Sequence, residues 1–400
     1  MGSLFSYTLA TLACLFGIPA TVLFLEVVAA IALPPRKCLQ RPNQDSRRRV
    51  AIIIPAHNES AGLLPTIGDI NLQMRAGDRM LVVADNCIDD TAAVAAATGA
   101  EVIERNDPTR MGKGYALDFA LKHLSLDPPA IVIIIDADCR VEEGAIDQLA
   151  TACAMTHSPI QALNLMTAPD ETRINYRVAE FAWRVKNWVR PLGLNALNLP
   201  CQLMGTGMAF PWGVIRSGNL ANRSIVEDLK LGIDLAQSGT PAQFCPSASV
   251  KSHFPLSVEG AESQRQRWEG GHIGMILTTA PRLIFKAIAG RNFDLLALTL
   301  DLAVPPLSLL VILLAGMSLV GGIAVLFGYS SVALIISGAC FIAVLLAIFL
   351  SWLKCGRDLL PPSAAFSIIL YIVAKLPIYR QLLSRNSDLQ WTRTDRNKDD

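Results

Sequence analysis

The chain has 400 residues, of which 52% are hydrophobic and 17% charged, and its formal net charge is +1. High hydrophobic content with low charge predicts a membrane portion beside a large folded domain, and the near-zero net charge excludes nucleic-acid binding through an overall basic field. The nine cysteines include no Cys-x-x-Cys pair, so we expect reduced thiols facing the cytosol rather than a zinc site or a disulfide framework.

An apolar stretch near the N-terminus predicts a transmembrane helix within residues 1–35. Its residues Leu4–Leu33 carry a single charge, Glu26, and basic residues follow between Arg36 and Arg49. The basic flank predicts that the helix ends on the cytoplasmic side. A cleaved signal peptide is the alternative, but the run lacks a basic start and is too long for one. We expect Glu26 to snorkel to the membrane interface, because it lies toward the basic end.

Strand-like and helix-like segments alternate over the next part of the chain. Helix-like runs such as Asp90–Thr98 and Gly114–Leu124 lie between strand-like runs, which are Val50–Pro55, Met80–Ala84, Ala100–Glu104, Ala130–Ile135 and Pro159–Met166. This alternation predicts an α/β domain over residues 48–258, with a mostly parallel sheet covered by helices on both faces. Ligands of such domains bind beyond the carboxyl ends of the strands.

Polar side chains follow three of these strand-like runs. His57–Glu59 follows the first run, Asp85 the second, and Asp136-Ala-Asp138 the fourth. Two carboxylates after a buried strand repel each other unless a cation compensates them, so Asp136 and Asp138 suit a divalent metal that carries phosphate oxygens. Helix or turn capping is the alternative interpretation of each of these residues.

Two further segments carry charges suited to sugar and phosphate chemistry. Lys113 lies in a glycine-containing loop, Arg110-Met-Gly-Lys113-Gly, which suits phosphate but lacks the spacing and the hydroxyl of a Walker loop. Glu227-Asp228 precedes a helix-like run, Leu229–Gln237, and Asp228 is either a helix cap or a general base that takes a proton from an attacking hydroxyl.

The segment Gln264-Arg-Gln-Arg267-Trp268 combines polar, cationic and aromatic side chains within one helical turn. Arg267 suits a diphosphate leaving group, because it can neutralise the charge that develops on it. Trp268 offers a flat apolar face to a sugar ring. A basic helix at the membrane interface is the alternative interpretation, and we assign residues 259–290 to such a helix.

The remaining segments are expected at or in the membrane. Glu171–Arg190 mixes tryptophans with basic residues at helical spacing, which predicts an interfacial helix or, alternatively, a surface helix with its aromatics packed inward. Within residues 294–353, two runs are long enough to span, Leu302–Phe327 and Val332–Leu353. The apolar run Ser363–Leu383 contains Lys, Pro and Arg, so we expect residues 361–400 to form an interfacial or re-entrant helix and a cytoplasmic tail.

Taken together, these motifs resemble those of the inverting family-2 glycosyltransferases, in particular the membrane-embedded branch that includes cellulose, hyaluronan and poly-N-acetylglucosamine synthases. The resemblance covers about Val50–Leu283. It is carried by five motifs in this order: Pro55-Ala-His-Asn-Glu59, Asp85-Asn-Cys-Ile-Asp89, Asp136-Ala-Asp138, Val226-Glu-Asp228 and Gln264-x-x-Arg267-Trp268.

The resemblance implies a Rossmann-like domain of the glycosyltransferase A type that binds a nucleotide sugar. Among nucleotide sugars, it favours a UDP-sugar. It implies Asp228 as the base, Asp136 and Asp138 as ligands of Mg²⁺ or Mn²⁺, and a set of donor-binding residues: Pro55, His57, Glu59, Asp85, Lys113, Asp136, Asp138, Gln264 and Arg267. The implied acceptor-binding residues are Gly205, Thr206, Gly207, Glu227 and Trp268. The tail Trp391-Thr-Arg-Thr394 resembles a gating-loop element of such synthases.

The resemblance further implies transfer of a sugar to a growing polysaccharide or oligosaccharide by a multi-pass protein of a bacterial-type inner or plasma membrane. Its catalytic domain would face the cytoplasm, and partner subunits are compatible with it. The alternative is transfer of a single sugar to a membrane lipid, and a transporter or a scaffold with an inert nucleotide-binding fold is a third option. Hydropathy predicts about three membrane spans in this chain, fewer than the synthases that form a polysaccharide channel have. The small number of spans argues against processive synthesis with translocation of the product.

The motifs depart from the family pattern at two positions. Asp85 stands in Ala84-Asp85-Asn86-Cys87, where a doubled Asp and a Gly-Ser pair are usual, so only Asp85 is carried over. Val226 stands where Thr is common before the Glu-Asp pair, which weakens the assignment of Asp228 as the base.

Overall fold

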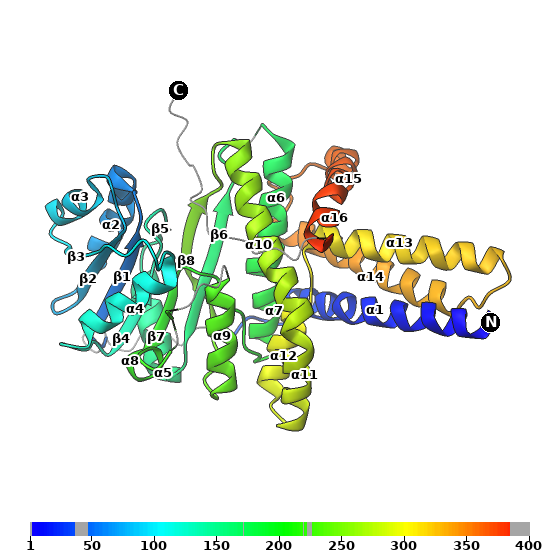
Figure 1. The fold of residues 1–400 in the computed structure, drawn as a ribbon, viewed down its shortest axis with the longest axis horizontal. Helices are drawn as coiled ribbons and strands as arrows, with labels where there is room; N and C mark the ends of the chain where they lie inside the picture. Colours follow the sequence, from blue (N-terminus) through cyan, green and yellow to red (C-terminus); the bar gives the residue numbers. More distant parts are fainter. Residues whose placement is uncertain (1, 37–46, 171, 219, 222–225, 385–400) are drawn as a thin grey trace.

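The computed structural model describes residues 2–36, 47–170, 172–218, 220–221 and 226–384. Three parts follow one another along the longest axis of the molecule: an α/β domain, a layer of crossing helices, and a bundle of long apolar helices (Figure 1).

An eight-stranded sheet forms the centre of the α/β domain. Its strands are β1 (Val50–Ala56), β2 (Arg79–Asp85), β3 (Glu101–Arg105), β4 (Ile131–Ile134), β5 (Arg140–Val141), β6 (Ile160–Thr167), β7 (Met208–Pro211) and β8 (Gln243–His253). The five predicted strands are all present, each within one residue of its expected ends. Three further strands were not predicted: β5 and β7, which are very short, and β8, whose sequence is mixed and contains Pro246.

The strand order is β3-β2-β1-β4-β7-β6-β8-β5. The first four strands are parallel, β7 is antiparallel to both β4 and β6, β8 is parallel to β6, and β5 is antiparallel to β8. The sheet is therefore mostly parallel, as predicted. The carboxyl ends of β1, β2 and β4 meet at one edge of the sheet, so the polar residues that follow these strands are brought together.

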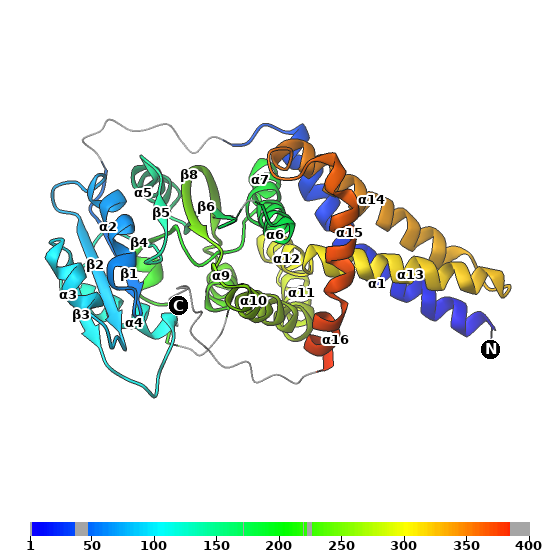
Figure 2. The same cartoon turned by 90° about the horizontal axis from the view of Figure 1, so that it is seen from above.

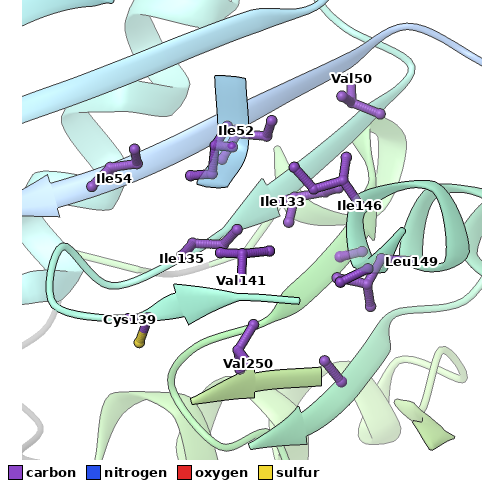
Figure 3. Packing of buried hydrophobic residues seen from close by; sticks show 14 of the residues in the cluster. Val50, Ile52, Ile54, Ile133, Ile135, Cys139, Val141, Ile146, Leu149 and Val250 are labelled. Carbon is purple, nitrogen blue, oxygen red and sulfur yellow. The ribbon is translucent and has the colours of Figure 1, made fainter. Parts of the chain in front are cut away.

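Helices cover both faces of this sheet. They are α2 (Leu64–Asn71), α3 (Thr91–Ala97), α4 (Lys113–Leu124), α5 (Ala145–Thr156), α8 (Trp212–Ile215) and α9 (Glu227–Gln237). Successive side chains of β1 enter different clusters: Ile52 and Ile54 pack with α2 and α5, whereas Ile53 packs with α4, α8 and α9. Figure 3 shows the first cluster. Because all three isoleucines are fully buried, β1 is a central strand and its run of β-branched residues is explained.

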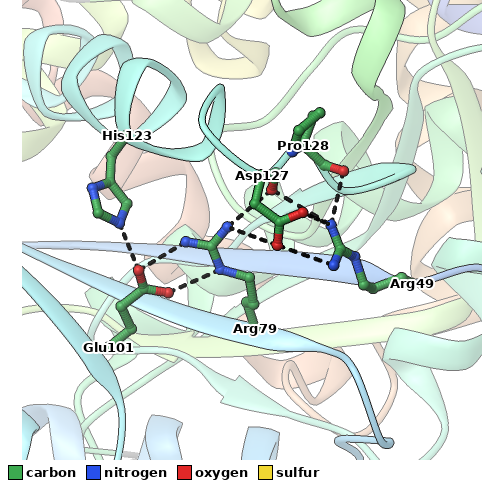
Figure 4. A network of polar contacts seen from close by, with 6 residues as sticks. All are labelled: Arg49, Arg79, Glu101, His123, Asp127 and Pro128. Carbon is green, nitrogen blue, oxygen red and sulfur yellow. Dashed lines mark hydrogen bonds and ion pairs between the residues drawn. The ribbon is translucent and has the colours of Figure 1, made fainter.

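Ion pairs tie together the opposite, amino edge of the sheet (Figure 4). Arg49, just before β1, bonds the carboxylate of Asp127 at 2.7 Å, and Arg79 of β2 bonds Glu101 of β3 at 2.8 Å. His123 of α4 lies 2.5 Å from the same Glu101 carboxylate. These contacts join the starts of three neighbouring strands, which leaves the carboxyl edge as the place for ligands.

The long apolar helices form a hairpin-like bundle that extends away from the α/β domain (Figure 1). They are α1 (Gly2–Ala32), α13 (Leu307–Leu326) and α14 (Val332–Cys355), and two short helices follow, α15 (Ala365–Ala374) and α16 (Leu376–Ser384). Figure 2 shows α15 lying across the long helices. Four helical segments in the described part of the chain are long and apolar enough to cross a membrane: Ser3–Ala32, Leu307–Leu326, Val332–Cys355 and Pro362–Arg380.

The crossing layer joins the two parts. It consists of α6 (Ile174–Arg184), a π-helical turn (Val185–Val189), α7 (Arg190–Ala196), α10 (Val258–Thr278), α11 (Ala280–Ala289) and α12 (Phe293–Leu302). The predicted helix over residues 171–190 is thus divided at the π-helical turn. The predicted helix over residues 259–290 is two helices, α10 and α11. The first predicted span, residues 302–327, begins later, at Leu307, because Pro305 and Pro306 separate α12 from α13.

The prediction that Glu26 snorkels to the membrane interface is wrong. Glu26 is buried and accepts a hydrogen bond from Arg190 Nε at 2.6 Å, and Arg190 Nη2 bonds Asp301 Oδ1 at 2.5 Å. The backbone of α7 approaches closely here, since a Cβ on Gly193 would lie 1.9 Å from the carbonyl oxygen of Glu26. A buried cation between two carboxylates therefore docks α1 and α12 onto α7.

Candidate active site

Hydrogen bonds fix the ends of β1 and β2 against each other. His57 Nδ1 donates to the carbonyl oxygen of Asp85 at 2.7 Å, and the Asn58 side-chain oxygen accepts from the Ile88 amide at 2.8 Å. Asn58 and Asn86 both adopt a positive φ, of 54° and 52°, which asparagine tolerates better than most residues. The two loops that carry predicted donor-binding residues are therefore held at one place.

Asp85 forms an ion pair that the sequence analysis did not anticipate. Its carboxylate, 9% exposed, accepts a hydrogen bond from Arg105 Nη1 at 2.5 Å. Burial raises the pKa of Asp85, against the opposing effect of the Arg105 charge. The Arg105 guanidinium also lies 5.5 Å from the centre of the Tyr115 ring. Arg105 ends β3 at the same edge of the sheet, and that position is the signal that could have identified it.

Lys113 and Asp136 form the centre of the site. The Lys113 ammonium is ion-paired with Asp136 and donates to the Gly205 carbonyl oxygen at 2.7 Å. The Asp136 amide donates to Thr206 Oγ1 at 3.0 Å, so Thr206 orients the Asp136 loop. Burial by itself would lower the pKa of Lys113, but the charges of Asp136 and Glu227 outweigh it and raise the pKa.

Asp136 and Asp138 fit a hard divalent cation by their chemistry. Both offer carboxylate oxygens, and the Asp136 side chain is 35% exposed. Among the described residues, no group of three or more His, Cys, Asp or Glu side chains is placed to hold a metal ion. Mg²⁺ is commonly held by one or two carboxylates together with substrate phosphates, and Mn²⁺ also prefers oxygen ligands. This pair thus suits a cation that arrives with phosphate oxygens.

Asp228 lies at the start of α9 and faces the same centre. Its Oδ1 accepts from the Leu229 amide at 2.8 Å, while its Oδ2 would lie 3.5 Å from a Cβ on Gly205. Gly205 has φ +89°, a conformation that favours glycine. Burial raises the pKa of Asp228 and raises the pKa of Glu227 to about 7. Asp228 therefore makes a helix-start contact and also lies beside Lys113, so the two interpretations of this residue are compatible.

A polar cavity of about 290 Å³ joins most of these groups. The predicted residues that line it are Lys113, Asp136, Gly205, Glu227, Asp228, Gln264, Arg267 and Trp268. The other predicted residues lie outside this lining; they are Pro55, His57, Glu59, Asp85, Asp138, Thr206 and Gly207. The predicted element Trp391–Thr394 lies outside the described residues. One cavity therefore brings together residues separated by more than 150 positions in the chain.

Gly207 has a packing reason to be glycine. Its φ is +65°, and a Cβ there would lie 2.8 Å from Ala162 Cβ and 2.9 Å from Val250 Cγ2. These residues belong to β6 and β8, so Gly207 lets β7 pack against them. Its role in acceptor binding stays a prediction.

Several lining residues of the polar cavity were not predicted as site residues, among them Lys186, Asn187, Arg190, His272 and Asp301. His272 donates from Nε2 to the Leu302 carbonyl oxygen at 2.9 Å, and burial lowers its pKa to about 3, so it is neutral at pH 7. A signal existed for His272, because it follows Gln264 and Trp268 at a spacing of four on α10. No such signal existed for Asp301, whose partner Arg190 is distant in the sequence.

A second cavity, of about 200 Å³, lies beside the polar one and is mainly apolar. Six residues line both cavities, and we call them the junction residues: Trp183, Lys186, Arg190, Gln264, Trp268 and His272. The rings of Trp183 and Trp268 have centres 5.2 Å apart. The rest of the apolar cavity is lined from α6, α13, α14 and α15, among other segments, so it lies between the α/β domain and the long apolar helices.

Comparison with known sequences places these features in a family. The profile of the family described as "Glycosyltransferase like family 2" matches residues 47–271, more than half of the chain. An uncharacterized glycosyltransferase of Mycobacterium tuberculosis is 37% identical over 100 residues, which are 25% of this chain and 41% of that protein. A probable glucomannan 4-beta-mannosyltransferase of Arabidopsis thaliana is 25% identical over 247 residues, 56% of this chain and 53% of that protein. The chain thus spans less than half of the mycobacterial relative.

Comparison with solved structures confirms the fold. The mannosyltransferase PcManGT of Pyrobaculum calidifontis, solved with GDP-Man and Mn²⁺, matches 95% of this chain and 100% of its own, with a TM-score of 0.54 and 16% identity. The α/β domain of glycosyltransferase A type, expected from the motifs, is therefore present together with the apolar helices.

Proposed function

This chain belongs to the Glycosyltransferase like family 2, and on that premise we propose that it transfers a sugar from a nucleoside-diphosphate donor to an acceptor at a membrane. One observation supports this proposal most strongly. The polar cavity joins Lys113 and Asp136, which suit a diphosphate with its cation, to Asp228, which suits a base. Donor and acceptor groups can therefore meet in one enclosed space.

The donor would lie along the carboxyl edge of the sheet. We propose that Asp136 and Asp138 hold Mg²⁺ or Mn²⁺ with the diphosphate, as the Mn²⁺ in the solved mannosyltransferase complex suggests. Pro55, His57, Glu59 and Asp85 would hold the nucleoside. Lys113, Gln264 and Arg267 would bind the diphosphate from the other sides, because two cations and an amide donor suit an anionic leaving group. The resemblance favours a UDP-sugar, while that mannosyltransferase binds GDP-Man.

The residues of the chain would support an inverting displacement. The acceptor hydroxyl attacks the anomeric carbon, its oxygen forms the new bond, and the bond to the diphosphate breaks with its electron pair leaving on the diphosphate. Asp228 takes the hydroxyl proton. A bound divalent cation would supply charge neutralisation at the diphosphate. Arg267 adds a fixed positive charge there, and Trp268 would carry the acceptor ring.

The long apolar helices are the basis for our proposals on the membrane topology and on the acceptor. We propose a multi-pass protein of a bacterial-type inner membrane in which α1, α13 and α14 span and the α/β domain faces the cytoplasm. The synthase-like motifs favour a growing polysaccharide or oligosaccharide, with Gly205–Gly207, Glu227 and Trp268 beside it. The second candidate is a membrane lipid, and the apolar cavity next to the polar one favours it.

A panel of nucleotide sugars tests this proposal. The full-length protein in detergent with Mn²⁺ is given UDP-, GDP- and other nucleotide sugars, with oligosaccharides or membrane lipid extract as acceptors. We expect one donor to release its nucleoside diphosphate in step with sugar transfer. If every donor binds no better than free phosphate and none releases a diphosphate, the transferase proposal is wrong and an inert nucleotide-binding fold replaces it.

A further inference from the structure

Lys186 is the junction cation that forms no ion pair in the described part of the chain, although the charges of Asp228 and Asp301 act on it from farther away. Arg190, the other junction cation, is held between Glu26 and Asp301, and His272 is neutral. Across the described residues, no hydrogen bond or ion pair involves the Lys186 ammonium, and its aromatic contact is the Trp183 ring, 5.9 Å from Nζ. Its ammonium is therefore available to an anionic ligand in the cavities, which would gain a charge-assisted hydrogen bond from it.

The surroundings of Lys186 explain where this ligand would lie. The Lys186 side chain is exposed and lines both cavities. Its surroundings within the protein still desolvate the ammonium and lower its pKa, while the charge of Asp228 acts in the opposite direction. Lys113 and Asp136 line only the polar cavity, whereas Lys186 lines both. Lys186 thus lies where the two cavities meet, whereas Asp136, which suits the donor diphosphate, borders the polar cavity alone.

The apolar cavity adds a second requirement for this ligand. Its lining includes Val178 and Phe181 of α6, Leu307 and Val311 of α13, and Ile348 of α14, which offer hydrocarbon contacts alone. A flexible hydrocarbon chain matches such a lining. Because the cavity lies against helices long enough to span a membrane, a lipid can supply that chain.

The backbone at Lys186 is unusual as well. Val185–Val189 forms a π-helical turn between α6 and α7, and such turns are rare and recur at functional sites. It lies between Trp183 and Arg190, so the three junction residues of this segment all lie in or beside it.

We propose that the acceptor is a membrane phospholipid whose headgroup carries both a phosphate diester and a hydroxyl. Its acyl chain would lie in the apolar cavity, its phosphate on Lys186, and its hydroxyl beside Asp228. This inference rests on the proposed transferase function and names its acceptor. The lipid hydroxyl oxygen bonds to the anomeric carbon, its proton passes to Asp228, and the nucleoside diphosphate leaves with the electron pair of the broken bond.

The first test measures lipid binding without any donor. The full-length protein is exchanged into micelles that contain equal amounts of phosphatidylglycerol, phosphatidylcholine and diacylglycerol, and the retained lipid is quantified by mass spectrometry. We expect the wild-type protein and Lys186→Arg to retain phosphatidylglycerol in excess, and Lys186→Gln to lose this excess. Lys122→Gln, an exposed lysine on α4, is the control and should behave as wild type. Equal retention by wild type and Lys186→Gln would overturn the inference.

The second test measures transfer in nanodiscs of phosphatidylcholine that contain phosphatidylglycerol or diacylglycerol, with the donor identified by the panel. We expect sugar on phosphatidylglycerol alone, and a loss of about 10- to 100-fold in kcat/KM for Lys186→Gln, the range for a lost hydrogen bond to a charged group. The donor Kd should not change. Equal transfer to diacylglycerol, or a Lys186→Gln defect in donor binding alone, contradicts the inference. Transfer to oligosaccharides without transfer to phosphatidylglycerol refutes this acceptor but leaves the transferase proposal standing.

Discussion

The carboxyl edge of the sheet and the junction differ in how their charges are balanced. At the sheet edge, Lys113 is paired with Asp136, and Asp85 is paired with Arg105. At the junction, Arg190 is paired on both sides, while Lys186 forms no ion pair among the described residues. At the edge, a metal and a diphosphate would take over side chains that already form ion pairs. At the junction, an anion would meet Lys186, which forms no ion pair among the described residues.

This difference separates two roles within one cavity. Pairs that exist before ligand arrives hold side chains in place, so the donor half is preorganised. Lys186, which forms no ion pair, would instead favour an anionic group, so we propose that the junction selects the acceptor. Asp228 lies between the two regions, because it is near Gly205 on one side and interacts with the Lys186 charge on the other.

The largest expected effect comes from the group shared by both regions. Asp228→Asn should lower kcat by about 10²- to 10⁴-fold, the range for a lost general base, and leave the donor Kd unchanged. Single-turnover transfer and equilibrium donor binding measure the two quantities. Asp234→Asn, an exposed position on the same helix, serves as the control. Near-normal turnover in Asp228→Asn would show that Asp228 is not the general base.

A substitution of Arg190 at the junction should lower the stability of the protein and leave the affinity for the donor unchanged. Arg190→Met leaves the buried Glu26 and Asp301 carboxylates without their cation, which should cost about 3–5 kcal/mol of unfolding free energy. Thermal unfolding in detergent measures this change. Arg140→Met removes an exposed partner of Asp69 and should leave the midpoint close to that of wild type. An unchanged midpoint in Arg190→Met would show that the pairs do not hold α1 and α12 to α7.

A substitution at the carboxyl edge of the sheet should lower the affinity for the donor. Asp138→Ala removes a proposed metal ligand, so donor binding with Mn²⁺ should weaken at least about tenfold, as disturbed metal sites do. It should also become insensitive to chelator. Isothermal titration with and without EDTA measures both effects. Glu142→Ala, at an exposed position just after β5, should bind donor as wild type does. If Asp138→Ala keeps its metal dependence, the cation lies elsewhere.

The smallest effect is a shift of the pH profile. Burial raises the pKa of Asp228, while the charges of Lys113 and Lys186 lower it. Because the base acts when deprotonated, kcat should rise with pH through a pKa above that of an ordinary aspartate. Lys186→Gln removes one lowering charge, so this acid limb should move to higher pH, and Lys186→Arg should restore it. A limb that stays in place in Lys186→Gln would show that the two groups do not interact.

The two regions also differ in how far the sequence predicts them. The strands of the donor half were found within one residue, because runs such as Ile52–Ile54 are buried on both faces and leave a clear pattern. Asp136 and Lys113 follow from motifs near those strands. Their ion pair could not be foreseen, since it depends on the exact course of two loops.

The junction was largely hidden from the sequence. Glu26, Arg190 and Asp301 lie in three separate helices, and no local pattern relates residues so far apart. The composition of the 171–190 segment suggested the membrane interface, yet the structure gives it a second use as a wall of the cavities. Short strands such as β5 and β7 were missed because tertiary pairing, rather than intrinsic propensity, defines them.

The central claim is that the sheet edge and the junction form one transferase site, with the donor on one side and the membrane acceptor on the other. The most direct test uses the full-length protein in lipid nanodiscs with Mn²⁺ and a sugar-labelled donor, and measures nucleoside diphosphate release and label in the membrane fraction together. The account predicts one labelled membrane product for each diphosphate released, and loss of both signals in Asp228→Asn. Diphosphate release that leaves only free sugar, or product that forms equally well in Asp228→Asn, would contradict it.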